Sequence, residues 1–184
     1  MTHTIPHYIK SNAKNYPKDI ALREKKFGVW KTKDWQQCLE EIENITLGLY
    51  AKEITGKKTI AILGNNTPRW TLAEIAVQAL GSIPLGIYSD ALESEIIYLI
   101  DYSSCRVVFV EDEEQADKIM SLSDSKGKID LIVYDEPKGM NKYDDKRLIS
   151  YKNLLKTGRE FKKNNTNFFN KLLENINEED TCIF

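Results

Sequence analysis

Four short, mostly apolar runs alternate with segments of helical period in the middle of the chain. The runs are residues 59–63, 83–87, 106–110 and 129–134. Continuous apolar runs of this length are typical of strands that are buried on both faces. Strand and helix in alternation predict right-handed crossovers. We therefore expect an α/β fold over residues 58–135, built from βαβ repeats, with a mostly parallel sheet that has helices on both faces.

The segments between these runs predict the crossover helices. A helix over residues 68–80 is expected to begin at Pro68, since proline at the first helical position loses no hydrogen bond. This helix is apolar nearly all round, which is typical of a buried helix. Ser89 or Asp90 is expected to cap the next helix, and a third is expected over residues 112–122.

An N-terminal region over residues 1–57 is expected to precede the repeats. Apolar residues at helical spacing predict a helix over residues 4–16. Two short β-rich runs around Gly28, at residues 20–22 and 29–32, predict a β-hairpin. Asp34 and Gln37 have the spacing of a capping box and predict a helix that runs to the vicinity of Gly56.

Residues 136–184 predict a peripheral segment with weaker signals. Short helices are expected over residues 150–156, ended by Gly158, and over residues 168–176. The Lys- and Asn-rich residues 159–167 predict a solvated loop. Residues 180–184 have the pattern with which the earlier strands begin, and the chain stops there. This pattern indicates a fragment that is truncated inside an element.

Composition and charge exclude several classes of function. The 184 residues contain 26 Lys and Arg and 28 Asp and Glu, so a net charge of −2 leaves no surplus to neutralise a nucleic acid. Cys38, Cys105 and Cys182 are too few and too scattered for a disulfide framework or a zinc site. No signal-peptide pattern and no run long enough for a transmembrane segment occurs. We therefore expect a cytoplasmic protein.

Candidate binding residues lie where the predicted parallel strands end, because open parallel sheets bind ligands there. Residues 64–69 follow the first run and residues 86–90 follow the second. Neither segment contains a glycine-rich phosphate motif. Each therefore has two interpretations, an ordinary strand-to-helix turn or a contact with a ligand.

The other reactive side chains favour structural interpretations. His3 and His7 are four residues apart, with no neighbouring ligand that would complete a metal site. Cys105 has no histidine nearby to act as a base, so we expect a small buried side chain rather than a nucleophile. The acidic residues 111–114 are expected to cap a helix, whose positive end favours them.

Several short segments, in their order and spacing, resemble the start of a long-chain acyl-CoA synthetase of the adenylate-forming AMP-dependent synthetase and ligase superfamily. They are DIALRE at residues 19–24, Trp35, TIAILGNNTPRW at 59–70, ALG at 79–81, GIYSD at 86–90, VVFVED at 107–112 and YDD at 143–145. The resemblance covers nearly the whole chain and weakens after about residue 155. It implies that residues 1–184 are the N-terminal portion of the large domain of such an enzyme.

The resemblance implies a fatty-acid substrate, with ATP, Mg²⁺ and coenzyme A (CoA) as cofactors of the full-length enzyme. The family's Ser/Thr/Gly-rich phosphate loop, Tyr-Gly-x-Thr-Glu segment and catalytic lysine do not occur here, so no catalytic or metal-binding residue is carried over. The fragment is expected to be inactive and to bind none of these cofactors tightly. Gly86, Tyr88 and Ser89 match a strand end near the CoA channel and are the candidate cofactor-binding residues. Peripheral membrane contact and a homodimer remain open.

Two alternatives to a ligase fragment also remain open. One is a free-standing flavodoxin-like or nucleotide-binding α/β module that ends naturally at Phe184. The other is a non-catalytic interaction domain whose exposed sheet edge pairs with a partner chain.

Overall fold

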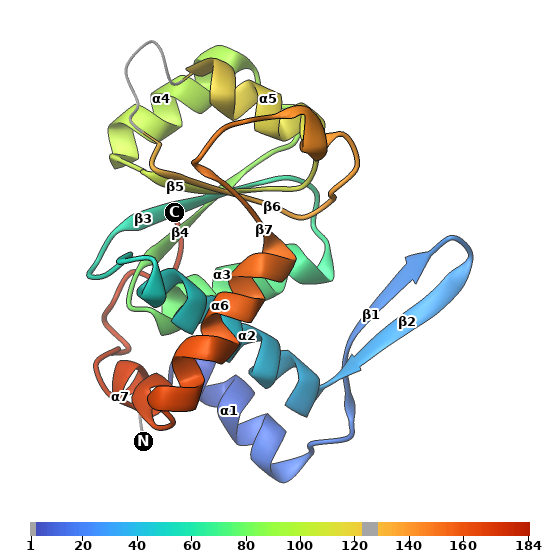
Figure 1. Cartoon of the computed structure of the whole chain (residues 1–184). Helices are drawn as coiled ribbons and strands as arrows, with labels where there is room; N and C mark the ends of the chain where they lie inside the picture. The colour runs from blue at the N-terminus through green and yellow to red at the C-terminus, as the bar shows by residue number, and fades with distance from the viewer. Residues whose placement is uncertain (1–2, 123–128) are drawn as a thin grey trace.

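A parallel sheet forms the centre of the molecule (Figure 1). The structure is a computed structural model that describes residues 3–122 and 129–184. Within these residues five strands lie in the order β4-β3-β5-β6-β7, and each neighbouring pair is parallel. The strands are β3 (Thr59–Leu63), β4 (Ile83–Ile87), β5 (Val107–Val110), β6 (Leu131–Tyr134) and β7 (Leu148–Ser150). The predicted α/β class is confirmed.

Helices cover both faces of this sheet. Figure 1 shows α4 (Glu93–Ser103) and α5 (Glu113–Leu122) above the sheet, and α2 (Trp35–Ala51), α3 (Pro68–Ala79) and α6 (Tyr151–Asn164) below it. Alternate side chains of β3 enter different cores. Ile60 and Ile62 join the core on the α2 and α3 side, whereas Ala61 and Leu63 join the core with α4 and α5. Burial of both faces explains why the strands are continuously apolar.

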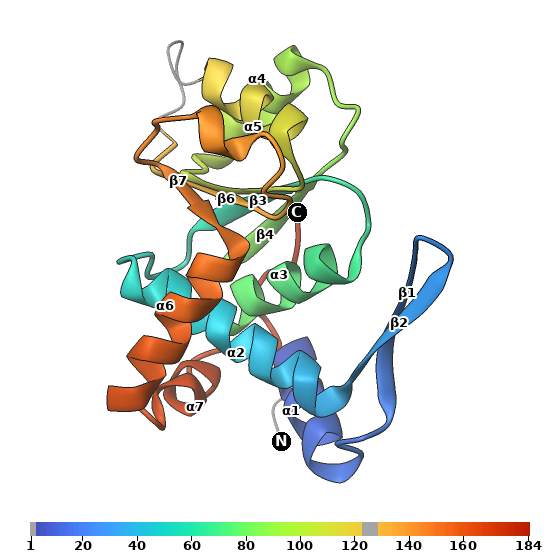
Figure 2. The same cartoon turned by 45° about the vertical axis from the view of Figure 1, so that its right-hand side comes forward.

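The predicted hairpin is present and projects from the body of the molecule (Figures 1 and 2). It consists of β1 (Ile20–Lys26) and β2 (Val29–Asp34), which are antiparallel. Phe27 and Gly28 form the turn, both with positive φ, 51° and 78°. The strands extend further than the predicted 20–22 and 29–32, because cross-strand pairing continues to Lys26 and Val29 at the turn.

Two of the expected helix starts are confirmed and one is wrong. The N–H of Gln37 donates to Asp34 Oδ1 at 2.8 Å and the N–H of Asp34 donates to Gln37 Oε1 at 2.9 Å, forming the expected capping box of α2. α3 begins at Pro68, as predicted. Neither Ser89 nor Asp90 caps α4, which begins at Glu93. The N–H of Leu92 donates instead to Glu95 Oε2 at 2.8 Å, so an acid within the first turn satisfies a free backbone donor.

The prediction that Gly158 ends a helix is wrong, and so is the predicted loop over residues 159–164, whereas residues 165–167 do connect two helices without regular structure. α6 continues through Gly158 to Asn164. Gly158 is buried against α2, where an added Cβ would lie 1.9 Å from the carbonyl oxygen of Asn44. The glycine therefore allows two helix backbones to touch, and the packing offsets its low helix propensity.

The remaining elements depart in part from expectation. α1 (Ile5–Asn15) matches the predicted first helix, and α7 (Phe168–Leu173) is shorter than predicted. β7 and the 3₁₀ helix η1 (Met140–Lys142) were not predicted. Residues 181–184 form no strand, contrary to expectation, although the N–H of Phe184 donates to the carbonyl of Pro84 in β4 at 3.0 Å. None of the helices in the described residues has the length and apolar content that crossing a bilayer requires.

Candidate functional site

The carboxyl ends of β3, β4, β5 and β6 meet at one edge of the sheet, as expected of parallel strands. Three of these ends are joined by hydrogen bonds. Glu111, after β5, accepts from the backbone N of Asn65 at 2.8 Å and from its Nδ2 at 2.9 Å. Ser89, after β4, donates from Oγ to Asn65 Oδ1 at 3.2 Å. Ser89, Asn65 and Glu111 thus form a chain across the edge in the spatial order β4-β3-β5.

Gly64 makes room for this chain. An added Cβ at this residue would lie 2.9 Å from Cβ of Glu111, closer than real Cβ atoms approach one another. The glycine therefore brings the end of β3 against Glu111. Lys118 supports the other end of the chain, since its Nζ donates to the carbonyl oxygen of Ser89 at 2.8 Å.

A second polar network links the edge to α2 and α6. Arg69, in the first turn of α3, forms an ion pair with Asp135 after β6, and its guanidinium lies 5.2 Å from the ring centre of Tyr151. The hydroxyl of Tyr151 donates to Glu41 Oε1 at 2.8 Å, and Glu41 also pairs with Lys33 of the hairpin. Burial, followed by the charge of Glu41, raises the pKa of Tyr151 well above its usual value, so this phenol stays protonated.

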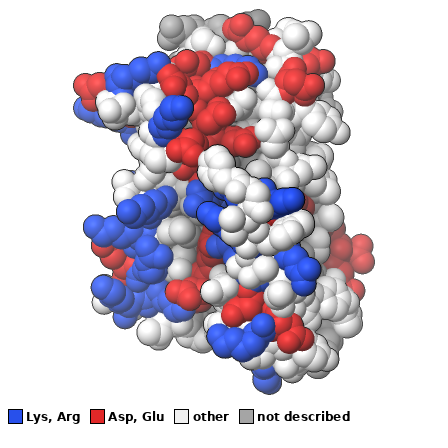
Figure 3. All heavy atoms as spheres, turned by 90° about the vertical axis from the view of Figure 1, so that its right-hand side faces the viewer, with Lys and Arg blue, Asp and Glu red and all other residues white. Residues whose placement is uncertain are grey.

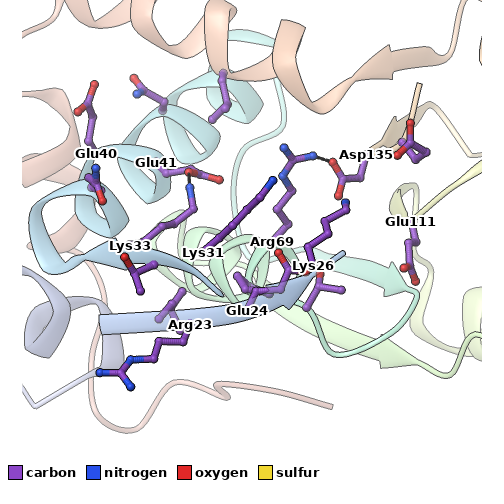
Figure 4. Close-up of a pocket in the computed structure, with 18 of the residues that line it drawn as sticks. Arg23, Glu24, Lys26, Lys31, Lys33, Glu40, Glu41, Arg69, Glu111 and Asp135 are labelled. Carbon is purple, nitrogen blue, oxygen red and sulfur yellow. Dashed lines mark hydrogen bonds and ion pairs between the residues drawn. The ribbon is translucent and has the colours of Figure 1, made fainter. Parts of the chain in front are cut away.

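A cavity of about 810 Å³ lies between the carboxyl edge, α2 and the hairpin. Figure 3 shows basic and acidic side chains gathered on this side of the molecule. In Figure 4, Lys26 and Lys31 point from the hairpin into the cavity, toward the side that holds Arg69 and Asp135, whereas Lys33 points toward Glu41 of α2. The charges of the lining are mixed, and its strongest contacts are ion pairs within the wall. The cavity can therefore accept polar groups, but its lining is neither mainly positive nor mainly negative.

The three candidate residues at the end of β4 differ in exposure. Gly86 lies within the strand, paired with Ile62, and an added Cβ would be 3.1 Å from Cζ2 of Trp70. Tyr88 is 82% exposed. Ser89 is half-buried and belongs to the hydrogen-bonded chain described above. Gly86 thus allows close packing of a ring, whereas Tyr88 and Ser89 are available at the edge.

Asn65, Glu111, Arg69 and Asp135 were not predicted to act together. Asn65, Glu111 and Asp135 share a signal in the sequence, since each lies one or two residues after the end of a buried strand, whereas Arg69 lies in the first turn of the helix that follows β3. Asn65 and Glu111 follow β3 and β5, which are neighbours only in space. Arg69 of α3 contacts Asp135 after β6, a strand that does not neighbour β3 in the sheet. The expected helix caps are present beside them, because Thr67 Oγ1 accepts from the N–H of Trp70 at 3.3 Å and Asp112 Oδ1 accepts from the N–H of Glu114 at 3.0 Å.

Cys105 and the two histidines contact neighbouring residues of the chain. Cys105 is buried and its Sγ donates to the carbonyl of Val107 at 3.1 Å; burial raises its pKa to about 11, so it is a poor nucleophile. His7 contacts Thr4 and His3 contacts Tyr8. Across residues 3–122 and 129–184, no group of three or more His, Cys, Asp or Glu side chains is arranged to hold a metal ion.

The family model described as AMP-binding enzyme matches residues 9–182 of the chain. Among curated proteins, the long-chain-fatty-acid–CoA ligase ACSBG2 of Homo sapiens is 23% identical over 122 residues, which are 66% of this chain and 18% of that protein. The long-chain-fatty-acid–CoA ligase heimdall of Drosophila melanogaster is 22% identical over 134 residues, 71% of this chain and 20% of that protein. The chain thus spans about a fifth of the length of these relatives.

Solved structures share the fold. The anthranilate CoA ligase AuaEII in complex with anthranoyl-AMP superposes with a TM-score of 0.72 at 15% identity, over 84% of this chain and 28% of that one. The coronafacic acid ligase of Pectobacterium brasiliense gives a TM-score of 0.72 at 16% identity, over 85% of this chain and 29% of that one. At 15% and 16% identity, this similarity shows that the chain shares its fold with these ligases.

Proposed function

The chain belongs to the AMP-binding enzyme family, and from that membership we propose that the whole protein is a long-chain fatty-acid–CoA ligase. In this reaction a fatty carboxylate attacks the α-phosphorus of ATP, which gives acyl-AMP and pyrophosphate. The thiol of CoA then displaces AMP and gives the acyl-CoA. The observation that carries the proposal is the family match over residues 9–182, together with curated relatives that are long-chain-fatty-acid–CoA ligases.

In this proposal the 184 residues supply scaffold and one wall of the CoA site. Acyl transfer to CoA requires that the cofactor be held in a fixed orientation. The end of β4 suits that task because Lys118 and Asn65 hold the turn at Ser89, and the ring of Tyr88 is presented to solvent. Such a ring can stack on the adenine of CoA, and the Ser89 turn can contact its polar groups.

ATP and Mg²⁺ are assigned to parts of the whole protein outside these residues. The residues do not fit these two groups, since the chain carries no glycine-rich phosphate loop and the described residues present no cluster of metal ligands. We therefore propose that the 184 residues alone form no acyl-adenylate. The whole protein, supplied with palmitate, ATP, Mg²⁺ and CoA, is expected to form palmitoyl-CoA. Absence of that product with every long-chain acid tested contradicts the proposed activity.

Tyr88→Ala in the whole protein is expected to raise KM for CoA about tenfold, because stacking of a base on an aromatic ring contributes about 1–3 kcal/mol. Adenylation measured without CoA should not change, since Tyr88 has no role in that half-reaction. Steady-state kinetics at varied CoA measures the effect. Tyr98→Ala, which removes a 63% exposed ring from α4, is the matched control. An unchanged KM in the Tyr88 variant rules out the proposed wall.

A further inference from the structure

The tip of the β1–β2 hairpin exposes apolar side chains that join neither hydrophobic core of the described residues. Phe27 is 93% exposed, and Val29 and Trp30 are each 63% exposed. Only Ala21 and Leu22, at the base of the hairpin, pack against the main core. Figures 1 and 2 agree that the hairpin projects from the body, so that its tip is the outermost point on that side.

The conformation of Phe27 makes its exposure more unusual. Its φ is 51°, and the following Gly28 has a φ of 78°. A two-residue turn with both φ values positive favours Asn-Gly or Asp-Gly, and a bulky residue in this region is strained. Phenylalanine is thus unfavourable at position 27 for two reasons: its backbone conformation is strained, and its apolar ring is exposed to water. Contact with an apolar environment outside the chain would offset both costs.

Cations surround this apolar tip. Lys25 lies opposite Trp30 and Lys26 lies opposite Val29 in the strand register. Further along the ribbon, Arg23 is exposed and points away from the cavity, as Figure 4 shows. The ribbon between residues 20 and 33 contains one acid, Glu24, and five cations, Arg23, Lys25, Lys26, Lys31 and Lys33. Of the cations next to the tip, Lys25 is exposed and does not line the cavity.

We propose that the hairpin tip docks on a membrane surface that contains anionic phospholipid. Phe27, Val29 and Trp30 enter the boundary between headgroups and acyl chains, and Arg23 and Lys25 contact the anionic headgroups. Aromatic residues favour this boundary, and each cation near an anionic surface adds to binding. Neither apolar insertion nor electrostatic attraction alone gives stable attachment to a membrane, and the hairpin supplies both. This inference does not depend on the proposed ligase activity, and its failure would leave that activity untouched.

The test is co-sedimentation of the chain with vesicles of phosphatidylcholine alone and with vesicles that also contain phosphatidylserine. The chain is expected to sediment with the anionic vesicles and to be released as salt is raised, because the Debye length shortens.

Phe27→Asn should lower the bound fraction about tenfold at limiting lipid, since a buried aromatic side chain is lost. The melting temperature of this variant should be unchanged or higher, because Asn favours the positive φ. Loss of binding therefore cannot come from unfolding.

Tyr102→Asn is the matched control, because it removes an 81% exposed ring from α4, away from the hairpin. It is expected to bind vesicles like the unchanged chain. Binding that survives Phe27→Asn, or that is equal on neutral and anionic vesicles, overturns the proposal. The proposal is also overturned if the chain does not bind vesicles but forms a concentration-dependent dimer that Phe27→Asn abolishes. The tip would then be a contact between two copies of the chain.

Discussion

Gly158→Ala is expected to lower the free energy of unfolding by about 1–2 kcal/mol. Alanine in the middle of a helix is normally more favourable than glycine by about 1 kcal/mol, so helix propensity alone predicts a more stable protein. Here the new Cβ would lie 1.9 Å from the carbonyl oxygen of Asn44 and 2.7 Å from its carbon. These are backbone atoms of α2 and cannot rotate away. Overpacking of this kind costs about 1–3 kcal/mol and at times more, which outweighs the gain in propensity.

Urea denaturation followed by circular dichroism measures this effect. Lys156→Ala is the control on the same helix, because the lysine is exposed and its pair with Glu160 lies at the surface. That variant should change the free energy of unfolding by less than about 0.5 kcal/mol. A Gly158→Ala protein as stable as the unchanged chain would mean that α6 does not pack against α2 as described.

Ile132→Ala is expected to lower the free energy of unfolding by about 2–5 kcal/mol. Ile132 is fully buried in β6, between the strands that carry Val108 and Leu148, and it belongs to the core beneath α4 and α5. Truncation loses the buried methyl groups and leaves a cavity that a sheet interior cannot close. This prediction concerns the face of the sheet opposite to Gly158 and is independent of the first.

A graded pair of substitutions makes this second test specific. Ile132→Val should cost about 0.5–1.5 kcal/mol, because one methylene is lost rather than three carbons. Val29→Ala, at the exposed hairpin tip, should cost less than about 0.5 kcal/mol. Equal effects of Ile132→Ala and Val29→Ala in urea denaturation would contradict the burial of β6 between two helical layers.

The central sheet could be predicted because its signal is local. The bounds of β3 and β4 agree with the predicted runs, since a strand covered on both faces is apolar at every position. α6 could not be predicted to its full length. The sequence shows a glycine at position 158, which commonly ends a helix, but not that this glycine lies against α2. Only the tertiary contact explains why the helix continues.

The candidate site was predictable in position but not in its contacts. The residues after the first two strand ends were interpreted either as strand-to-helix turns or as contacts with a ligand, and Ser89 lies at the carboxyl edge. The bonds from Asn65 to Ser89 and Glu111 depend on β3 lying between β4 and β5. The hydrophobic pattern does not specify that order, because each strand has the same continuous run. The pairing of Arg69 with Asp135 was not predictable for the same reason.

ATP–pyrophosphate exchange tests the central claim most directly, namely that the protein activates a fatty acid with groups that these 184 residues do not contain. With palmitate and Mg²⁺, the whole protein should return labelled pyrophosphate to ATP, and the purified 184-residue chain should give only the background rate. Palmitate-dependent exchange by the 184 residues alone, or none by the whole protein, would contradict the account.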